Sequence, residues 1–371
     1  MSLILDFDFE YRLEGFTLAP ALTMEQGVSA LYGPSGAGKS LTLLCLVGLR
    51  RPERGWIRLN GRTLFDAETG IHVVPHLRRM ALVFQEYALF PHMTVAGNLA
   101  YGLRGLTGAD VRKRVDAMLR LLRLEGFGNR YPGDLSGGQR QRVALGRGLI
   151  VQPELLLLDE PFSALDQMER ERLRAEVLDL LQGFGGTTIL VTHNLQEAYL
   201  MARQIAVIDS GRILQSGPRD EVLQHPRDRR VAEHVGASNI FRGTAAVDAA
   251  GSSVVAWHGA QLTFSGSLPP PGAEVEFCIR PEDVRLVWPE RVADKPNALH
   301  GYIASGVERG IDYAMRFRAE GGASAAGEIM IQCSEHVRHL MKLHPGKPVW
   351  IFFPPDKLHV LAPVPGGRAI R

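Results

Sequence analysis

The sequence predicts an α/β domain built on a parallel sheet over residues 1–235, followed by an all-β domain over residues 236–371. Up to about residue 235, short apolar runs alternate with amphipathic helical stretches, an order typical of parallel α/β domains. Several of these runs are apolar at consecutive positions, as expected of strands covered on both faces. Beyond that point, short alternating strands between Gly and Pro clusters predict a small OB-like barrel or a sandwich.

The composition excludes several classes of protein. A chain of 371 residues is too long for one ordinary core, and an apolar content of 45% argues against disorder. A net charge of +2 without a long basic block does not favour nucleic acid as a partner. The three cysteines form no zinc or redox pattern. The first residues lack the features of a signal peptide, and no apolar run approaches the roughly 20 residues of a membrane span, so any membrane role is expected to be peripheral.

The elements of the first domain are expected in alternating order. Strands are predicted at residues 28–36, 80–85, 154–160, 187–193 and 205–211. Helices are predicted at residues 39–48, 109–124, 139–151, 167–183 and 195–202, with a helical subdomain over about 87–150. The linker to the β-rich domain is expected around residues 233–240.

The stretch GPSGAGKS at residues 33–40 predicts a phosphate-binding loop. It matches G-x-x-x-x-G-K-[ST] at every fixed position, with a strand before it and a helix after it. Glycines let consecutive backbone N–H groups turn toward an anion, and the helix N-terminus adds partial positive charge. The positions assigned to the nucleotide are Gly33, Pro34, Ser35, Gly36, Ala37, Gly38, Lys39 and Ser40. Lys39 is expected against the β- and γ-phosphates of a nucleotide, and the Ser40 hydroxyl on Mg²⁺.

Two carboxylates end the apolar run LLLLDE at residues 155–160. Ligands of open α/β sheets bind at the carboxyl ends of the strands, so Asp159 is expected to hold Mg²⁺ and Glu160 to orient or deprotonate an attacking water. The alternative is the ordinary preference of helix N-termini for acids. The phosphate-binding loop in the same chain favours the catalytic interpretation.

Two further polar residues follow predicted strands. His193 ends the run TTILVTH, and we expect it to contact the γ-phosphate, although an isolated strand-end histidine is more often structural. Gln85 ends ALVFQ and is a candidate for reaching the metal or the attacking water, on a weaker signal.

The stretch LSGGQRQRVALGRGL at residues 135–149 places a Ser-Gly-Gly turn before an arginine-rich helix. Such a turn presents free N–H donors and the hydroxyl of Ser136, which is an anion site with no anion of its own. Helix capping explains Ser136 but not the two glycines after it. Gly146 and Gly148, inside this helix, have no explanation in the sequence, since each costs about 1 kcal/mol relative to alanine.

These motifs together resemble the ATP-binding subunits of ABC transporters over about residues 1–235. The motifs occur in the order GPSGAGKS, VFQ, LSGGQRQR, LLLLDEP, SALD and VTHN. The resemblance implies a P-loop ATPase that forms a head-to-tail dimer around two ATP molecules. It assigns Ser136, Gly137, Gly138, Gln139 and Asp166 to the ATP held by the other copy. An adenine-stacking aromatic is also implied, with Tyr11 as the candidate and Phe16 as the alternative.

The resemblance also implies partners and a cargo. The runs around Gln85 are most similar to importer ATPases for oxyanions, above all molybdate; ferric iron, sulfate and polyamine are the alternatives. The aromatic segment 85–93 is expected to receive a membrane permease, with Phe90 and Met93 as anchors, or to be an ordinary loop. A solute-binding protein outside the membrane is an indirect partner. The subunit is expected on the cytoplasmic face of the bacterial inner membrane.

The β-rich part resembles the regulatory domain appended to importer ATPases, with CIRPEDVRLV as its clearest fragment. Arg280 in that fragment is interpreted as a surface turn in preference to a ligand contact. Two other function classes share the ATP-binding motifs. ABC ATPases of DNA repair, chromosome structure or translation carry coiled coils, zinc cysteines or two heads, none of which this sequence shows. A non-catalytic ATP-binding regulator would lack Glu160 or His193, and both are present.

Overall fold

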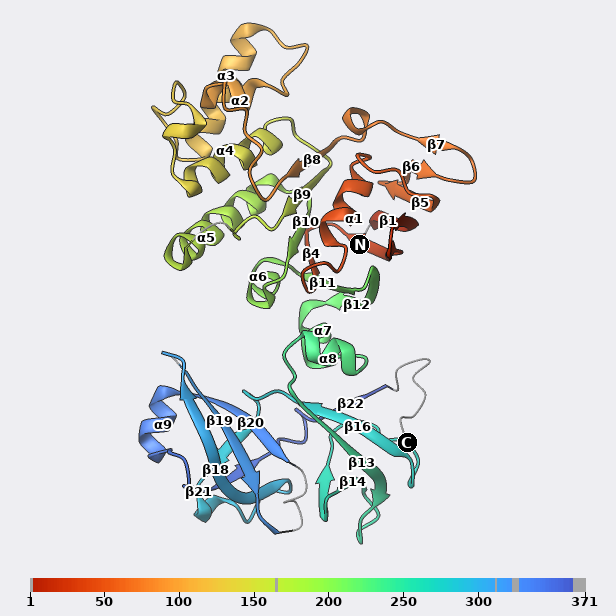
Figure 1. Ribbon diagram of the computed structural model, residues 1–371, viewed down its shortest axis with the longest axis vertical. Helices are drawn as coiled ribbons and strands as arrows, with labels where there is room; N and C mark the ends of the chain where they lie inside the picture. Colours follow the sequence, from red (N-terminus) through yellow and green to blue (C-terminus); the bar gives the residue numbers. More distant parts are fainter. Residues whose placement is uncertain (1–2, 164–165, 311, 322–326, 363–371) are drawn as a thin grey trace. The chain divides into compact units, whose positions relative to one another are not determined.

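The computed structural model describes residues 3–163, 166–310, 312–321 and 327–362. The chain divides into two compact units, Met1–Arg219 and Asp220–Arg371 (Figure 1). The domain boundary expected near residue 235 stays a prediction. Among the described residues, no helix combines the length and apolarity needed to cross a membrane.

The first unit is organised around a six-stranded sheet that is mostly parallel. Its spatial order is β12 (Arg212–Pro218), β11 (Gln204–Asp209), β4 (Val28–Tyr32), β10 (Thr187–Thr192), β9 (Leu155–Asp159) and β8 (Met80–Val83). Only the β11–β12 pair is antiparallel. The five strands predicted for this domain are therefore confirmed. Because β4, β9 and β10 run parallel, the residues after them meet at one edge of the sheet.

The apolar run of β9 serves two cores. Leu156 and Leu158 pack into a core with the helices that follow β8. Leu155 and Leu157 pack into a second core with α1 (Lys39–Leu46) and an antiparallel sheet. Side chains alternate across a strand, so consecutive leucines are buried on both faces. This is why the strand is uniformly apolar rather than alternating.

The second core is closed by an antiparallel sheet at the N-terminal side of this unit. Its strands are β1 (Leu3–Leu13), β2 (Phe16–Leu18), β3 (Ala21–Glu25), β5 (Arg54–Leu59), β6 (Arg62–Asp66) and β7 (Ile71–His72). Its order is β2-β1-β5-β6-β7, and β3 pairs with β1. The short helix η1 (Pro75–Leu77) leads from this sheet into β8.

The five predicted helices of the first unit lie close to their expected positions, and the structure adds α2 and η2, which were not predicted. The helices are α1 (Lys39–Leu46), α2 (Val95–Ala100), α3 (Gly108–Leu121), η2 (Pro132–Asp134), α4 (Gly137–Leu149), α5 (Gln167–Phe184) and α6 (Leu195–Met201). Side chains cap α2, α3, α4, α5 and α6 through Thr94, Thr107, Ser136, Asp166 and Asn194. Figure 1 shows α2, α3 and α4 grouped beyond the β8 end of the sheet, with α1 beside β1.

The second unit is all-β apart from short helices, as predicted. Its helices are α7 (Arg219–Gln224), whose first residue closes the first unit, α8 (Arg229–His234), η3 (Pro289–Arg291) and α9 (Glu335–Met341). One sheet contains β13 (Asn239–Val247), β14 (Ser253–Trp257), β15 (Ala260–Thr263), β16 (Glu274–Ile279) and β22 (His359–Leu361). The other contains β17 (Arg285–Val287), β18 (Ala298–Glu308), β19 (Asp312–Ala319), β20 (Glu328–Ser334) and β21 (Pro348–Phe352).

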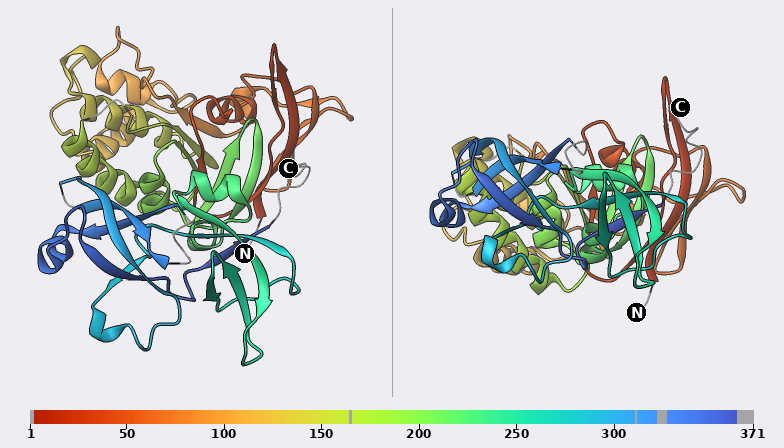
Figure 2. Two further views of the ribbon diagram at one scale, coloured as in Figure 1. Left: turned by 60° about the horizontal axis from the view of Figure 1, so that its bottom comes forward. Right: turned by 90° about the horizontal axis from the view of Figure 1, so that it is seen from below.

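The two sheets of the second unit share one hydrophobic core. Phe277 and Trp257 come to it from the first sheet, and Ile303 and Phe317 come from the second. Figure 2 shows the ribbons of the two sheets side by side in this unit.

Candidate functional site

The predicted phosphate-binding loop lies between β4 and α1. Gly36 and Gly38 have φ of 80° and 102°, in the left-handed region that favours glycine. A Cβ at Gly33 would lie 2.0 Å from the carbonyl oxygen of Ile208, and one at Gly38 would lie 2.8 Å from Cδ1 of Leu18. The loop therefore depends on glycine for its turn and for the close approach of the chain around it.

Lys39 is buried at the first position of α1, with an exposed fraction of 5%. Its Nζ donates to the carbonyl oxygens of Gly33 and Pro34 at 3.0 and 2.9 Å, and lies 3.6 Å from Oε1 of Glu160. Burial lowers the pKa of Lys39, and the Glu160 carboxylate opposes that shift. The loop thus holds a cation in place at a helix N-terminus, where an anion is favoured.

Ser40 and Asp159 come together from α1 and the end of β9. The Ser40 hydroxyl donates to Oδ1 of Asp159 at 2.9 Å. Burial raises the pKa of Asp159, while the hydrogen bond from Ser40 acts in the opposite direction. A hydroxyl and a carboxylate side by side are the oxygen ligands that Mg²⁺ prefers, so these two residues fit the ion.

Glu160 and His193 form a pair at the ends of β9 and β10. Nδ1 of His193 lies 3.0 Å from Oε2 of Glu160. Glu160 has φ of 42°, a costly conformation for a residue with a side chain, and such strain is concentrated at functional sites. Both residues line a cavity of about 70 Å³. Its size and carboxylate lining suit a few water molecules.

A buried network behind His193 was missed in the sequence. Glu197 of α6 accepts a 3.0 Å bond from Nη2 of Arg174 on α5 and a 2.6 Å bond from the Thr192 hydroxyl. It joins two helices to the residue directly before His193. Both charged residues lie inside amphipathic helices, where the pattern predicts a solvated face, so only the fold reveals their burial.

Other predicted residues lie outside this cluster of contacts. Gln85 is exposed after β8, and among the described residues no hydrogen bond or ion pair joins it to Asp159 or Glu160. Phe16 lies against the phosphate loop, with ring atoms 3.2 and 3.5 Å from where a Cβ of Gly38 would be. Tyr11 pairs with Leu18 across β1 and β2 and packs partly buried on the second core. The adenine contact stays a prediction for either aromatic.

The Ser-Gly-Gly turn opens α4 as expected, but two of its N–H donors are already occupied. Ser136 and Gln139 form a capping box in which the Gln139 N–H donates to Oγ of Ser136 and the Ser136 N–H to Oε1 of Gln139. The Gly138 N–H donates to Oε1 of Glu169 at 3.1 Å. Asp166 caps α5 by accepting from the Glu169 N–H at 2.9 Å. The expectation of an anion site without an anion of its own is wrong for Gly138, because Glu169 supplies a carboxylate from α5.

The aromatic segment after Gln85 is held in place by α4, the helix that begins at the Ser-Gly-Gly turn. Tyr87 and Ala88 have φ of 63° and 46°, so consecutive residues with side chains are in the left-handed region. Arg147 of α4 donates to the carbonyl oxygens of Ala88 and Tyr87 at 2.8 and 3.3 Å. Its guanidinium also stacks on Phe90, 5.1 Å from the ring centroid.

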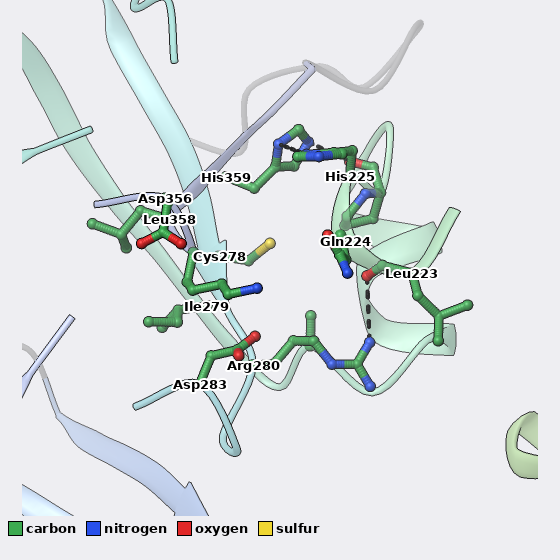
Figure 3. Close-up of a pocket in the computed structure, with 13 residues that line it drawn as sticks. Leu223, Gln224, His225, Cys278, Ile279, Arg280, Asp283, Asp356, Leu358 and His359 are labelled. Atoms are coloured by element: carbon green, nitrogen blue, oxygen red, sulfur yellow. Dashed lines mark hydrogen bonds between the residues drawn. The ribbon is translucent and has the colours of Figure 1, made fainter. Parts of the chain in front are cut away.

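Arg280 of the second unit is partly buried and binds within its own unit. Its Nη1 donates to the carbonyl oxygen of Leu223 in α7 (Figure 3). Its Nε donates to Oε1 of Glu282. It lines a cavity of about 20 Å³ with His225 and His359, room for about one water molecule. The interpretation of Arg280 as a surface turn is therefore incomplete, since its side chain ties α7 to the β domain.

Comparison with known proteins identifies the family. Residues 21–163 match the ABC transporter family, and residues 277–361 match the TOBE domain. Over 347 residues the chain is 39% identical to the spermidine/putrescine import ATP-binding protein PotA of Frankia alni, an alignment that spans 90% of this chain and 72% of PotA. The chain belongs to the ATP-binding subunits of ABC importers. This ABC ATPase binds ATP and couples its hydrolysis to import.

Other relatives differ in their named cargo. The ABC ATPase is 35% identical to the molybdenum import protein ModC of Paramagnetospirillum magneticum, over 81% of this chain and 84% of ModC. It is 46% identical to the sulfate/thiosulfate import protein CysA of Caulobacter vibrioides, over 58% of this chain and 63% of CysA. Among solved structures, cbiO1 from Clostridium perfringens, part of the ABC transporter complex cbiONQ, superposes with a TM-score of 0.53 at 28% identity, over 60% of this chain and 91% of cbiO1.

Proposed function

We propose that two copies of this ABC ATPase close head to tail around two ATP molecules and that hydrolysis reopens them, which drives a separate membrane permease. The observation that carries the proposal is the convergence of Lys39, Ser40, Asp159, Glu160 and His193 at the carboxyl ends of β4, β9 and β10. In this arrangement the phosphate loop of one copy holds the nucleotide, and the turn at Ser136 in the other copy faces its γ-phosphate.

Each residue of the cluster has a distinct role in the proposed hydrolysis. The Lys39 ammonium exchanges its hydrogen bonds to the carbonyl oxygens of Gly33 and Pro34 for contacts with the β- and γ-phosphates. Glu160 accepts the proton of the attacking water, and His193 orients the Glu160 carboxylate while its other ring nitrogen binds the γ-phosphate. Ser40 and Asp159 would hold Mg²⁺, with Gln85 as a further ligand, and the ion would neutralise charge developing on the phosphates.

The proposed docking site for the permease is the segment from Gln85 to Met93. Support comes from its aromatic side chains. Arg147 also donates to a backbone carbonyl of the strained turn and stacks on Phe90. Phe90 is half-buried against Tyr101, with ring centroids 4.4 Å apart, so its ring is already oriented for a partner helix. Docking there would hold the subunit peripherally on the cytoplasmic face of the bacterial inner membrane.

For the cargo we propose an inorganic oxyanion, with molybdate first and sulfate second. The motif runs around Gln85 support molybdate, and the ModC relative aligns over most of both chains. Polyamine is the competing class, because the PotA relative aligns over more of this chain at slightly higher identity.

The decisive experiment on the motor function uses Glu160→Gln. This variant is expected to bind ATP, to form a stable dimer in analytical ultracentrifugation and to hydrolyse ATP at least about 100-fold more slowly than the parent. Glu154→Gln, a carboxylate at the opposite end of β9 that pairs with Arg79, is the matched control and should leave hydrolysis unchanged. Normal hydrolysis by Glu160→Gln would remove Glu160 from the mechanism.

A second experiment identifies the cargo. The ATPase is reconstituted in vesicles with its permease and its solute-binding protein, and ATP hydrolysis is measured with molybdate, tungstate, sulfate, ferric iron or putrescine. Stimulation by molybdate and tungstate supports the first choice. Stimulation by putrescine or ferric iron alone contradicts an oxyanion cargo.

A further inference from the structure

Glu169, on α5, contacts the Ser136-Gly137-Gly138 turn at the start of α4, which is called the signature turn below. Its Oε1 accepts the Gly138 N–H at 3.1 Å. A Cβ at Gly138 would lie 2.7 Å from the same oxygen, so the carboxylate packs directly against the glycine. Asp166 fixes the start of α5 and thereby sets Glu169 on the first turn of that helix, facing α4.

The capping box leaves Gly138 available to such an acceptor. Ser136 and Gln139 satisfy each other's backbone N–H groups, and the Gly138 N–H takes no part in that exchange. A negative charge at the N-terminus of a helix is favourable, because the free N–H groups carry partial positive charge. The carboxylate of Glu169 therefore occupies a position at which a phosphate oxygen would also be favourably bound.

We propose that Glu169 competes with the nucleotide phosphate for the signature turn, so that closure of the dimer requires its carboxylate to leave Gly138. The inference rests on the proposed head-to-tail dimer. One N–H cannot donate a full hydrogen bond to two anions at once, and two negative charges at this distance repel. The contact holds the turn in an occupied state until ATP on the partner copy displaces it, which raises the ATP concentration needed for closure.

The test measures dimer formation in a background that does not hydrolyse ATP. Glu160→Gln is the parent, and the dimer fraction is followed against ATP concentration by analytical ultracentrifugation. Adding Glu169→Ala is expected to lower the ATP concentration of half-maximal dimer about three- to fivefold, the fold-change that corresponds to loss of one charge interaction at a helix terminus. Adding Glu169→Gln, which keeps an acceptor without the charge, should give a smaller decrease. Glu171→Ala, an exposed carboxylate on the same helix, is the control and should change nothing.

The outcomes separate the inference from the proposed function. If the parent dimerises and both Glu169 variants require the same ATP concentration as the parent, the competition does not exist. If they require more ATP, Glu169 supports the turn instead of competing for it, and the inference is overturned. If the parent itself forms no dimer with ATP, the head-to-tail function fails, and this inference fails with it. Thermal melting of each variant, expected to match the parent, shows that the comparison concerns folded protein.

Discussion

Nδ1 of His193 lies 3.0 Å from Oε2 of Glu160, and the other oxygen of the same carboxylate lies 3.6 Å from Nζ of Lys39. One carboxylate thus bridges the phosphate-binding lysine and the histidine that follows β10. The parallel pairing of β9 with β10 produces this bridge, because it places residues 160 and 193 at the same sheet edge.

Replacing His193 should separate hydrolysis from ATP binding. His193→Ala is expected to slow steady-state hydrolysis roughly 100-fold, since it removes the partner that orients Glu160, and to change ATP affinity less than about twofold. His193→Gln, which can still donate a hydrogen bond, should recover part of the rate. A parallel loss of binding and rate in His193→Ala, measured by equilibrium titration and phosphate release, would show that His193 acts mainly through its γ-phosphate contact and not by orienting Glu160.

Arg78 should be a large contributor to the stability of the first unit. It is fully buried and donates to the carbonyl oxygens of Cys45 and Leu46 at the end of α1, and of Val73. Burial lowers the pKa of Arg78 to about 10, which still leaves it charged at neutral pH. Arg78→Met should cost about 3 kcal/mol of unfolding free energy in urea, because buried carbonyls lose their donor. The exposed neighbour change Arg79→Met should cost less than about 1 kcal/mol; equal effects would contradict this role.

The two glycines of α4 should respond in opposite ways to alanine. A Cβ at Gly146 would lie 2.4 Å from Cδ1 of buried Leu122, whereas one at Gly148 would meet its nearest atoms at 3.4–3.5 Å. Gly146→Ala should therefore destabilise the protein by about 1–3 kcal/mol through overpacking. Gly148→Ala should be neutral or stabilise it by up to about 1 kcal/mol, through helix propensity. Thermal melting of the single variants tests both expectations. A Gly146→Ala variant at least as stable as the parent would show that the side chains around Gly146 move to accommodate the added methyl group.

Arg147 should couple the permease to the ATPase. Arg147→Met removes the donor to the carbonyl oxygens of Tyr87 and Ala88, and with it the support of a strained turn. We expect the isolated subunit to keep its basal hydrolysis within about twofold and the reconstituted complex to lose most of its cargo-stimulated rate. Arg123→Met, at an exposed position after α3, is the control. If cargo still stimulates hydrolysis by the Arg147→Met complex, the hydrogen bonds of Arg147 do not couple the permease to the ATPase.

The β-rich unit should lose stability in mild acid through His359. Its Nε2 donates to the carbonyl oxygen of Pro226, which leaves Nδ1 to accept from Nδ1 of His225 at 3.3 Å (Figure 3). Burial, and secondarily His225, lower the pKa of His359. The unfolded chain then binds the proton more tightly, so stability is full above the unfolded pKa of about 6.5 and declines as the pH falls through it.

His359→Gln should therefore reduce the fall in melting temperature between pH 7.5 and pH 5.5. His336→Gln, an exposed histidine on α9, should keep the full decline of the parent. A parent whose melting temperature is unchanged over this range would show that the pair does not titrate there.

Much of the fold followed from local patterns. The runs ending at Asp159 and His193 are apolar at consecutive positions, and the helix starts carry capping residues such as Ser136 and Asn194. These signals depend on neighbours in the chain, so five strands of the mostly parallel sheet, five helices and the phosphate-binding loop were predictable. The antiparallel sheet of the first unit and α2 were not predicted. The distribution of the β9 leucines between two cores was not, because it depends on which elements cover each face.

The sequence by itself determined which residues carry the chemistry, since the spacing of GPSGAGKS and the placement of acids after LLLLDE are local properties. Only the tertiary structure decided which of them touch. It joined Glu160 to both Lys39 and His193, and it brought Glu169 from α5 onto Gly138 of α4, 31 positions away in the chain. Such contacts arise from the packing of elements distant in sequence, for which no local period exists, and for that reason the turn at Gly138 looked vacant in the sequence and is occupied in the fold.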